Sequence, residues 1–153
     1  MDATDRRILH ELQSDARRPN KALASSAGVS PSTMLNRVRS MEERGVIRGY
    51  HAEVDLPSLG RHVEALVSVR LDPKTPAAVD EFIDAIWAMD ETIAVTLLTG
   101  AFDIVVHVSA ADVATLGATV LSGIASAPHV ADEQTSIIFD HRHKRVLASL
   151  GDV

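Results

Sequence analysis

Cysteine is absent from the chain, aromatic residues are scarce, and no long apolar run occurs. Without cysteine there is neither a disulfide nor a thiolate metal site, which fits a reducing compartment. Aromatic residues make up 3% of the sequence, so any core must be aliphatic. No stretch approaches the roughly 20 apolar residues that a membrane helix needs, and the first residues lack the apolar segment of a signal peptide. We therefore expect a cytoplasmic protein with no membrane partner.

The chain has a formal net charge of −6, but this charge is unevenly divided. Residues 1–60 contain nine Lys and Arg against eight Asp and Glu, whereas residues 61–153 contain six against thirteen. The acidic excess lies in the second part, so the first part can form a basic surface for an anionic partner such as DNA. In a chain of 153 residues, this asymmetry indicates two small domains.

Residues 20–47 have the pattern of two helices joined by a tight turn. Asn20 is placed to cap the first helix, and Gly28 supplies the positive φ that the turn needs. Ser30 is placed to cap the second helix, which is expected to end near Gly45. Side chains at helical spacing form an apolar stripe along this second helix: Met34, Leu35, Val38 and Met41.

The opposite face of the second helix is polar. Hydroxyl and amide groups can hydrogen-bond to base edges, and guanidinium groups reach phosphates or guanine. A plain two-helix hairpin with a solvated face is the alternative, but the capping and turn residues together favour a helix-turn-helix that reads double-stranded DNA. Arg37 lies beside the apolar stripe, so it either contacts DNA or braces the domain. The predicted base-reading residues are Ser32, Thr33 and Asn36, and the other predicted DNA contacts are Arg37, Arg39, Ser40 and Arg48.

The helix-turn-helix is expected to lie in a winged-helix-like domain of residues 1–54. A preceding helix begins near Thr4 or Asp2, either of which can cap it. After the second helix of the motif, the residues from 50 to 55 alternate in polarity and form a short strand or wing at best. Proline and glycine then mark a linker over residues 55–62.

Residues 63–153 show strand-like and helical patterns in the order βαββαβ. This order predicts a ferredoxin-like domain, with two helices on one face of a four-stranded sheet, and hence an α+β protein. The helices are expected to direct Trp87, Val113 and Leu121 inward with their other apolar side chains. The other sheet face carries Leu66, Leu98, Val105 and Ile138, which favours covering by a second copy and a two-fold dimer. The expected strands are residues 63–71, 92–99, 102–109 and 132–139, and the expected helices are residues 76–89 and 111–126.

Four segments in this order resemble the Lrp/AsnC family of leucine-responsive and asparagine-responsive transcriptional regulators. They are DRRILHELQSDAR at 5–17, LASSAGVSPSTMLNRVRSMEERGVIRGY at 23–50, VDLPSLG at 54–60 and LLTGAFDIVVHV at 97–108. The resemblance covers essentially the whole chain. It implies a DNA-binding domain followed by a ligand-sensing domain that dimerises and assembles into tetramers or octamers. It also implies an amino acid or related metabolite as effector, and a place on the nucleoid.

The resemblance further implies an effector site at Gly100, Ala101, Phe102, Asp103 and Thr135. Gly100 permits close approach of the backbone, loop N–H groups can hold a carboxylate, and Asp103 suits an α-ammonium group. The alternative is a plain β-turn in which Asp103 hydrogen-bonds to its own backbone. The family more often has a polar residue where Ala101 stands and tyrosine where Phe102 stands, so the effector differs from the usual ones or is absent.

The chain contains seven histidines, of which His141 and His143 lie in the basic run HRHKR, with His129 nearby in sequence. A metal site needs a third ligand at a recognisable spacing, so we expect a solvated basic tail and no metal. His107 falls in a strand on the same face as Val105. It is either a satisfied core residue or a pH-sensitive interface residue.

No nucleophile–base pair, phosphate-binding glycine loop or cofactor motif is present, so we expect no catalytic residue and no cofactor. Sirohaem decarboxylases, which share the two-domain plan, are an enzyme alternative that only His107 and the cluster 141–145 would suit. The complete recognition helix argues against this enzyme. A chromosome-organising protein that wraps DNA with weak sequence preference is a further alternative. The prediction is a sequence-specific transcriptional regulator that responds to an amino acid.

Overall fold

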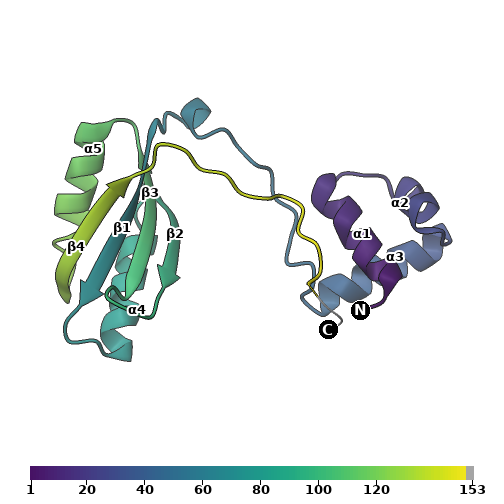
Figure 1. Ribbon diagram of the computed structural model, residues 1–153, viewed down its shortest axis with the longest axis horizontal. Helices are drawn as coiled ribbons and strands as arrows, with labels where there is room; N and C mark the ends of the chain where they lie inside the picture. Colours follow the sequence, from purple (N-terminus) through teal and green to yellow (C-terminus); the bar gives the residue numbers. More distant parts are fainter. Residues whose placement is uncertain (151–153) are drawn as a thin grey trace. The chain divides into compact units, whose positions relative to one another are not determined.

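The computed structural model describes residues 1–150, which form two compact units (Figure 1). One unit comprises Met1–Glu53 together with the segment that begins at Arg142, and the other comprises Val54–His141. The sequence placed that last segment in the second domain, whereas in the structure it groups with the first. One turn of 3-10 helix, Pro57–Leu59, lies in the expected linker.

The first unit contains three helices, α1 (Ala3–Ser14), α2 (Asn20–Ala27) and α3 (Pro31–Glu43). Asp2 caps α1, and the Ser30 hydroxyl caps α3 by accepting a hydrogen bond from the Thr33 N–H at 3.1 Å. Gly28 ends α2 with φ of +70°, the left-handed backbone that the turn was expected to need. The helices enclose one small core, made of Ile8, Leu23, Ala24, Met34 and Met41.

Two local predictions for this unit were wrong. Asn20 does not cap α2, whose cap position is Pro19. The Asn20 amide instead donates to the carbonyl of Pro31 at 2.9 Å, which ties the start of α2 to the start of α3. Residues 48–55, all of them described, form no strand, so the expected strand or wing is absent from this segment.

The apolar stripe of α3 is narrower than the sequence suggested. Met34 and Met41 are fully buried, but Leu35 is 52% exposed. Each residue turns the helix by about 100°, so Leu35 lies well round the axis from Met34. Because α1 and α2 cover only the Met34 side of α3, Leu35 remains on the surface.

The segment after Arg142 is docked on the first unit. The Gln13 carboxamide of α1 donates to the Leu147 carbonyl at 3.1 Å and accepts from the Leu147 N–H at 2.9 Å, much as a neighbouring strand would. Arg145 pairs with Glu53 at 2.6 and 2.7 Å. The basic tail is therefore anchored at two points instead of being freely solvated.

The second unit is an antiparallel sheet with helices on one face (Figure 1). Its elements are β1 (Val63–Leu71), α4 (Pro76–Trp87), β2 (Thr92–Leu97), β3 (Ile104–Ala110), α5 (Val113–Ala118), a π-helical turn (Thr119–Ile124) and β4 (Val130–Ile137). The strand order is β2-β3-β1-β4. The predicted ferredoxin-like βαββαβ arrangement is confirmed, with β1 matching its expected range.

The core of this unit lies between the sheet and the two helices. Alternate residues of β1, from Ala65 to Leu71, are buried against Phe82 and Ile86 of α4 and Leu116 of α5. Each fully buried Val, Leu, Ile or Phe side chain stabilises the fold by about 1.5–3 kcal/mol relative to the same side chain left exposed. The period-2 pattern in the sequence correctly identified the inward face of β1.

Three side chains expected to face inward are exposed instead. Trp87, the last residue of α4, is 63% exposed, because it lies about 100° round the helix axis from the buried Ile86. Val113 stands in the first turn of α5 and Leu121 in the wider π-helical turn that follows. The wider turn changes the angle between successive residues, so a pattern based on 3.6 residues per turn no longer holds there.

Candidate DNA interface and effector site

The first turn of α3 is organised by a cluster of hydroxyl groups. Ser30 Oγ lies 3.0 Å from Ser32 Oγ and 2.8 Å from Thr33 Oγ1, in addition to its capping bond. These contacts fix the orientation of two predicted base-reading side chains at the end of the helix that would enter a groove. The hydroxyl groups remain on the surface, because both residues are exposed.

The predicted DNA contacts of α3 form one continuous exposed face, apart from Arg37. Ser32, Asn36 and Ser40 follow one another at intervals of four residues, and Arg39 lies beside them. At 1.5 Å per residue, this face extends about 12 Å along the helix. That length suits contact with a few successive base pairs in the major groove.

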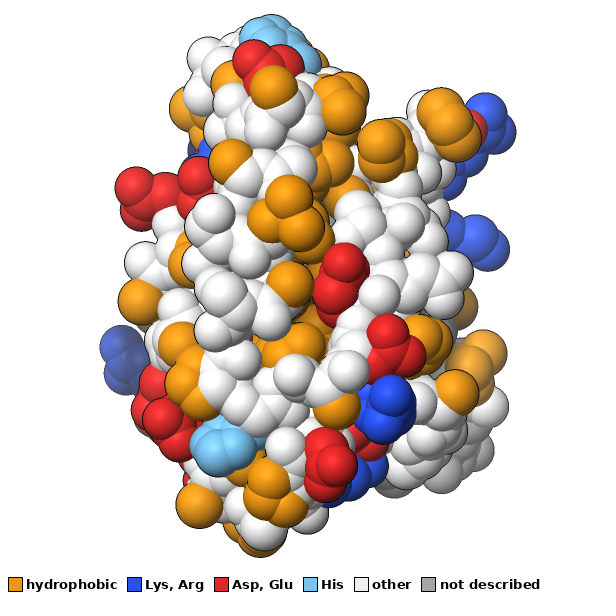
Figure 2. Space-filling view, turned by 90° about the vertical axis from the view of Figure 1, so that its left-hand side faces the viewer, with side chains coloured by type: hydrophobic (Ala, Val, Ile, Leu, Met, Phe, Trp, Pro, Cys, Tyr) orange, Lys and Arg blue, Asp and Glu red, His pale blue; other side chains and the backbone are white. Residues whose placement is uncertain are grey.

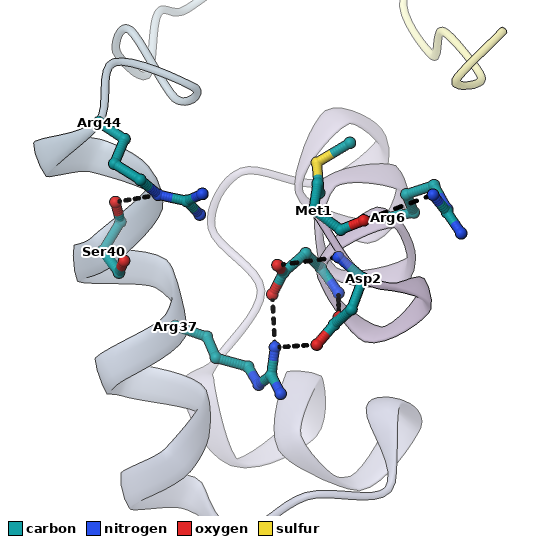
Figure 3. A network of polar contacts seen from close by, with 7 residues as sticks. Met1, Asp2, Arg6, Arg37, Ser40 and Arg44 are labelled. Atoms are coloured by element: carbon teal, nitrogen blue, oxygen red, sulfur yellow. Dashed lines mark hydrogen bonds and ion pairs between the residues drawn. The ribbon is translucent and has the colours of Figure 1, made fainter. Parts of the chain in front are cut away.

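Arg37 points away from this face and toward the start of α1. Figure 3 shows its guanidinium group beside Asp2, and Nη1 lies 2.7 Å from a carboxylate oxygen of Asp2 and 2.7 Å from one of Asp5. The two carboxylates also cap α1 by bonding to each other's backbone N–H groups. These contacts raise the pKa of Arg37, and the capping bond and Arg37 lower the pKa of Asp2. Of the two roles considered, the structure favours the brace.

Arg44 and Tyr50 fix the chain where it leaves α3. Arg44 Nε donates to the carbonyl of Ser40 at 3.1 Å (Figure 3). The Tyr50 hydroxyl donates to Glu42 at 2.9 Å, and partial burial with this carboxylate raises the pKa of the phenol. Arg48 lies in the segment that this bond restrains, and it is exposed. No periodic pattern in the sequence signalled the Tyr50 contact.

The expected effector loop joins β2 to β3, and Asp103 is its most constrained residue. One carboxylate oxygen accepts the Leu71 N–H at 2.9 Å, and the other pairs with Lys74. The Asp103 N–H donates to the Val69 carbonyl at 2.9 Å. Lys74 and the Leu71 N–H hold the pKa of Asp103 below its ordinary value, so this carboxyl is ionised at neutral pH.

Gly100 and Ala101 form the exposed tip of the same loop, with Phe102 half-buried beside them. Gly100 has φ of +134°, a backbone conformation that side chains rarely adopt. The loop therefore presents backbone to its surroundings at the tip and an ionised carboxylate at its base. Lys74, which the sequence analysis missed, belongs to this cluster.

Thr135 does not join the loop within one chain. It lies on β4 opposite Val67, and β1 separates β4 from β3. Its hydroxyl donates to Glu133 at 3.0 Å. Thr135 instead lines a shallow cleft of about 200 Å³ between α5 and β4, with Val113, Leu121 and Ile137. Figure 2, which views the side where α5 and β4 lie, shows hydrophobic side chains gathered along a hollow.

His107 lies on the sheet face that the helices leave open. Its Nε2 is 2.8 Å from a carboxylate oxygen of Glu64, and its ring stacks on His141 with 6.0 Å between centroids. His107 is therefore not part of the core, although its ring nitrogen has a partner, and its place on the open sheet face is the one that the interface alternative requires. Among residues 1–150, no group of three or more His, Cys, Asp and Glu side chains is arranged to hold a metal ion.

Known protein families match the two units in the same order. Residues 1–42 match the AsnC-type helix-turn-helix domain, and residues 64–146 match the Lrp/AsnC ligand binding domain. The chain belongs to the Lrp/AsnC family of transcriptional regulators. It is therefore a DNA-binding regulator with an amino-acid ligand-binding domain and not an enzyme.

Individual members of the Lrp/AsnC family resemble the chain over most of its length. It is 39% identical over 141 residues to the HTH-type transcriptional regulator AldR of Mycobacterium tuberculosis, covering 92% of this chain and 79% of AldR. It is 31% identical over 140 residues to the leucine-responsive regulatory protein of Haemophilus influenzae, covering 92% and 84%. A solved complex of a Neisseria meningitidis regulator with L-methionine superposes with a TM-score of 0.88 at 28% identity, covering 96% of each chain.

Within residues 1–150, none of the helices has the length and apolar character needed to cross a bilayer.

Proposed function

We propose that this regulator acts on DNA in the cytoplasm as a two-fold dimer that presents two copies of α3 to successive major-groove faces. Ser32, Thr33 and Asn36 read base edges, while Arg39 and Arg48 contact phosphates. The exposed face along α3 supports this assignment, because its polar groups have the chemistry that base edges require. The half-sites of the operator then lie one helical turn of DNA, about 34 Å, or a multiple of it apart.

The helix-free sheet face provides the dimer contact in this proposal. Leu66 and Leu98 are substantially exposed there, and Val105 and Ile138 are only partly covered. Exposed apolar side chains gathered on one face favour an interaction surface. A second copy of the sheet covers it symmetrically, and further association of dimers gives tetramers or octamers.

An amino acid is the proposed effector, bound at the loop between β2 and β3. The loop tip offers backbone N–H groups for the α-carboxylate, and Asp103 supplies the negative charge for the α-ammonium group. The methionine complex of the Neisseria relative favours an effector of this class. Binding changes the assembly only if the effector has a different affinity for the two assemblies.

Thr135 completes the proposed effector contacts. Because β1 separates Thr135 from the loop within one chain, we propose that a neighbouring copy brings its Thr135 to this loop. The site is then complete only in the assembly, which links effector binding to the assembly state.

The exposed polar face of α3 is the observation that carries the DNA-binding proposal. The test is fluorescence anisotropy of the purified protein on its own upstream DNA at near-physiological salt, with and without a pool of amino acids. A scrambled duplex of the same composition is the competitor, because nonspecific binding is electrostatic and insensitive to sequence. We expect binding that resists the competitor and changes with the pool. Equal affinity for both duplexes, unchanged by amino acids, would instead favour a chromosome-organising role.

A further inference from the structure

Lys74 covers the carboxylate of the effector loop. It lies in the connection between β1 and α4, and its ammonium group pairs with Asp103. The Lys74 side chain is 56% exposed, whereas that of Asp103 is only 9% exposed. Asp103 therefore meets solvent mainly through the lysine that stands over it. The carboxylate that the proposed function assigns to an α-ammonium group is already occupied by an ammonium group of the protein.

Two further hydrogen bonds hold Asp103 in place. Its second carboxylate oxygen accepts the Leu71 N–H at 2.9 Å, and its backbone N–H donates to the Val69 carbonyl at 2.9 Å. These two bonds hold Asp103 independently of its contact with Lys74. Lys74 is held less firmly, because more than half of its long side chain is exposed and pairing costs that side chain conformational freedom.

A buried carboxylate that loses its cation is strongly disfavoured unless another cation replaces it. Arg70 contributes a positive field at Asp103, but its own guanidinium lies 3.6 Å from Asp132. Arg70 therefore does not replace the direct contact that Lys74 makes with Asp103. The ammonium group of a ligand can replace it, and exchanging one ammonium group for another leaves the charge at Asp103 unchanged.

We propose that an α-amino-acid effector binds by displacing Lys74 from Asp103, an inference that rests on the proposed effector function. The α-ammonium group takes the place of Lys74 at the carboxylate. The freed lysine then binds the α-carboxylate, which one carbon atom separates from the ammonium group. Lys74 thus makes the site selective for ligands that carry both charges, because an amine alone must compete with it and leaves it unpaired.

The exchange is tested by comparing the affinities of two half-ligands, each of which carries only one of the two charged groups of an amino acid. The probes are L-methionine and L-leucine, each with its decarboxylated amine and its deaminated acid, and affinities are measured by isothermal titration calorimetry at pH 7. The variant Lys74→Met removes the cation that competes with the ligand's ammonium group for Asp103. It also removes the group that would bind the ligand's α-carboxylate. A hydrogen bond to a charged group is worth about tenfold or more in affinity. We therefore expect the amines to bind about tenfold tighter and the acids about tenfold weaker than to the wild type.

Controls separate this exchange from a general loss of structure. Lys21→Met changes an exposed lysine of the other unit and is expected to leave all affinities unchanged. Lys74→Gln, which keeps a donor for Asp103, serves as the second variant if Lys74→Met does not fold. If an amino acid binds the wild type but both half-ligands change in the same direction, or neither changes, the exchange is refuted and the effector role stands. If neither amino acid binds the wild type, the methionine- or leucine-type effector is refuted along with the exchange.

Discussion

Arg37 and Arg39 provide the sharpest test of how α3 is used, because they are close in sequence and differ in expected role. Two residues at about 100° each place them some 200° apart around the helix. Arg37 accordingly meets Asp2 and Asp5 at 2.7 Å, whereas Arg39 lies on the exposed polar face. One arginine should therefore support the fold, and the other should contact DNA.

The different roles of Arg37 and Arg39 can be measured from the salt dependence of DNA binding. Each phosphate contact contributes about 0.9 to the slope of log K against log salt concentration. A dimer that loses Arg39 from both copies should therefore lose about 1.8 from the slope. Arg37→Met should leave the slope unchanged and lower the melting temperature of the protein, because it removes the partner of two carboxylates.

The assay is anisotropy on one duplex at several salt concentrations for Arg37→Met and Arg39→Met, with melting followed by circular dichroism on the same samples. Arg39→Met is the matched control for the removal of an arginine from α3, and its melting temperature should not change. The reasoning fails if Arg37→Met lowers the slope by as much as Arg39→Met while the melting temperature stays the same.

Three further results are expected. Asn36→Ala should reduce discrimination between the operator and its point variants by about 1–3 kcal/mol per half-site, and an equal loss on random DNA would remove Asn36 from base reading. Gly28→Ala should destabilise the first unit by about 1–2 kcal/mol in chemical unfolding, because its φ of +70° is unfavourable for alanine; unchanged stability would contradict this. Because the pKa of Asp103 is lowered in the folded state, its stabilising effect is complete above the unfolded pKa of about 3.9 and is lost as the pH falls through the lower folded value. Asp103→Asn, compared with the wild type in acid titrations of stability, should flatten this loss, and identical profiles would show that the carboxylate carries no such linkage.

Helix caps and turns could be predicted from the sequence where one residue type suits one particular backbone conformation. Gly28 was expected at a positive φ and Ser30 at a helix start, and both are found there. The alternation along β1 likewise identified its buried side, because strand geometry allows only two faces. These features depend on neighbours within a few residues.

Features that depend on residues far apart in the sequence could not be predicted. Leu35 was expected in the buried stripe but is exposed, and the choice between the two roles of Arg37 was left open, because the position of α1 against α3 decides both. The sequence also gave no sign that Gln13 meets Leu147, 134 residues further along the chain. Lys74 was overlooked for the same reason, since only folding brings it to Asp103.

The central claim is that two copies of α3 read a symmetric operator and that an amino acid alters how such sites are held. Hydroxyl-radical footprinting on the bound upstream DNA, with and without the amino acid that alters binding, tests it most directly. We expect two protected half-sites about one helical turn, or a multiple of it, apart, and a change in the number of protected half-sites when the amino acid is added. Continuous protection without paired half-sites, the same with and without amino acids, would contradict the claim.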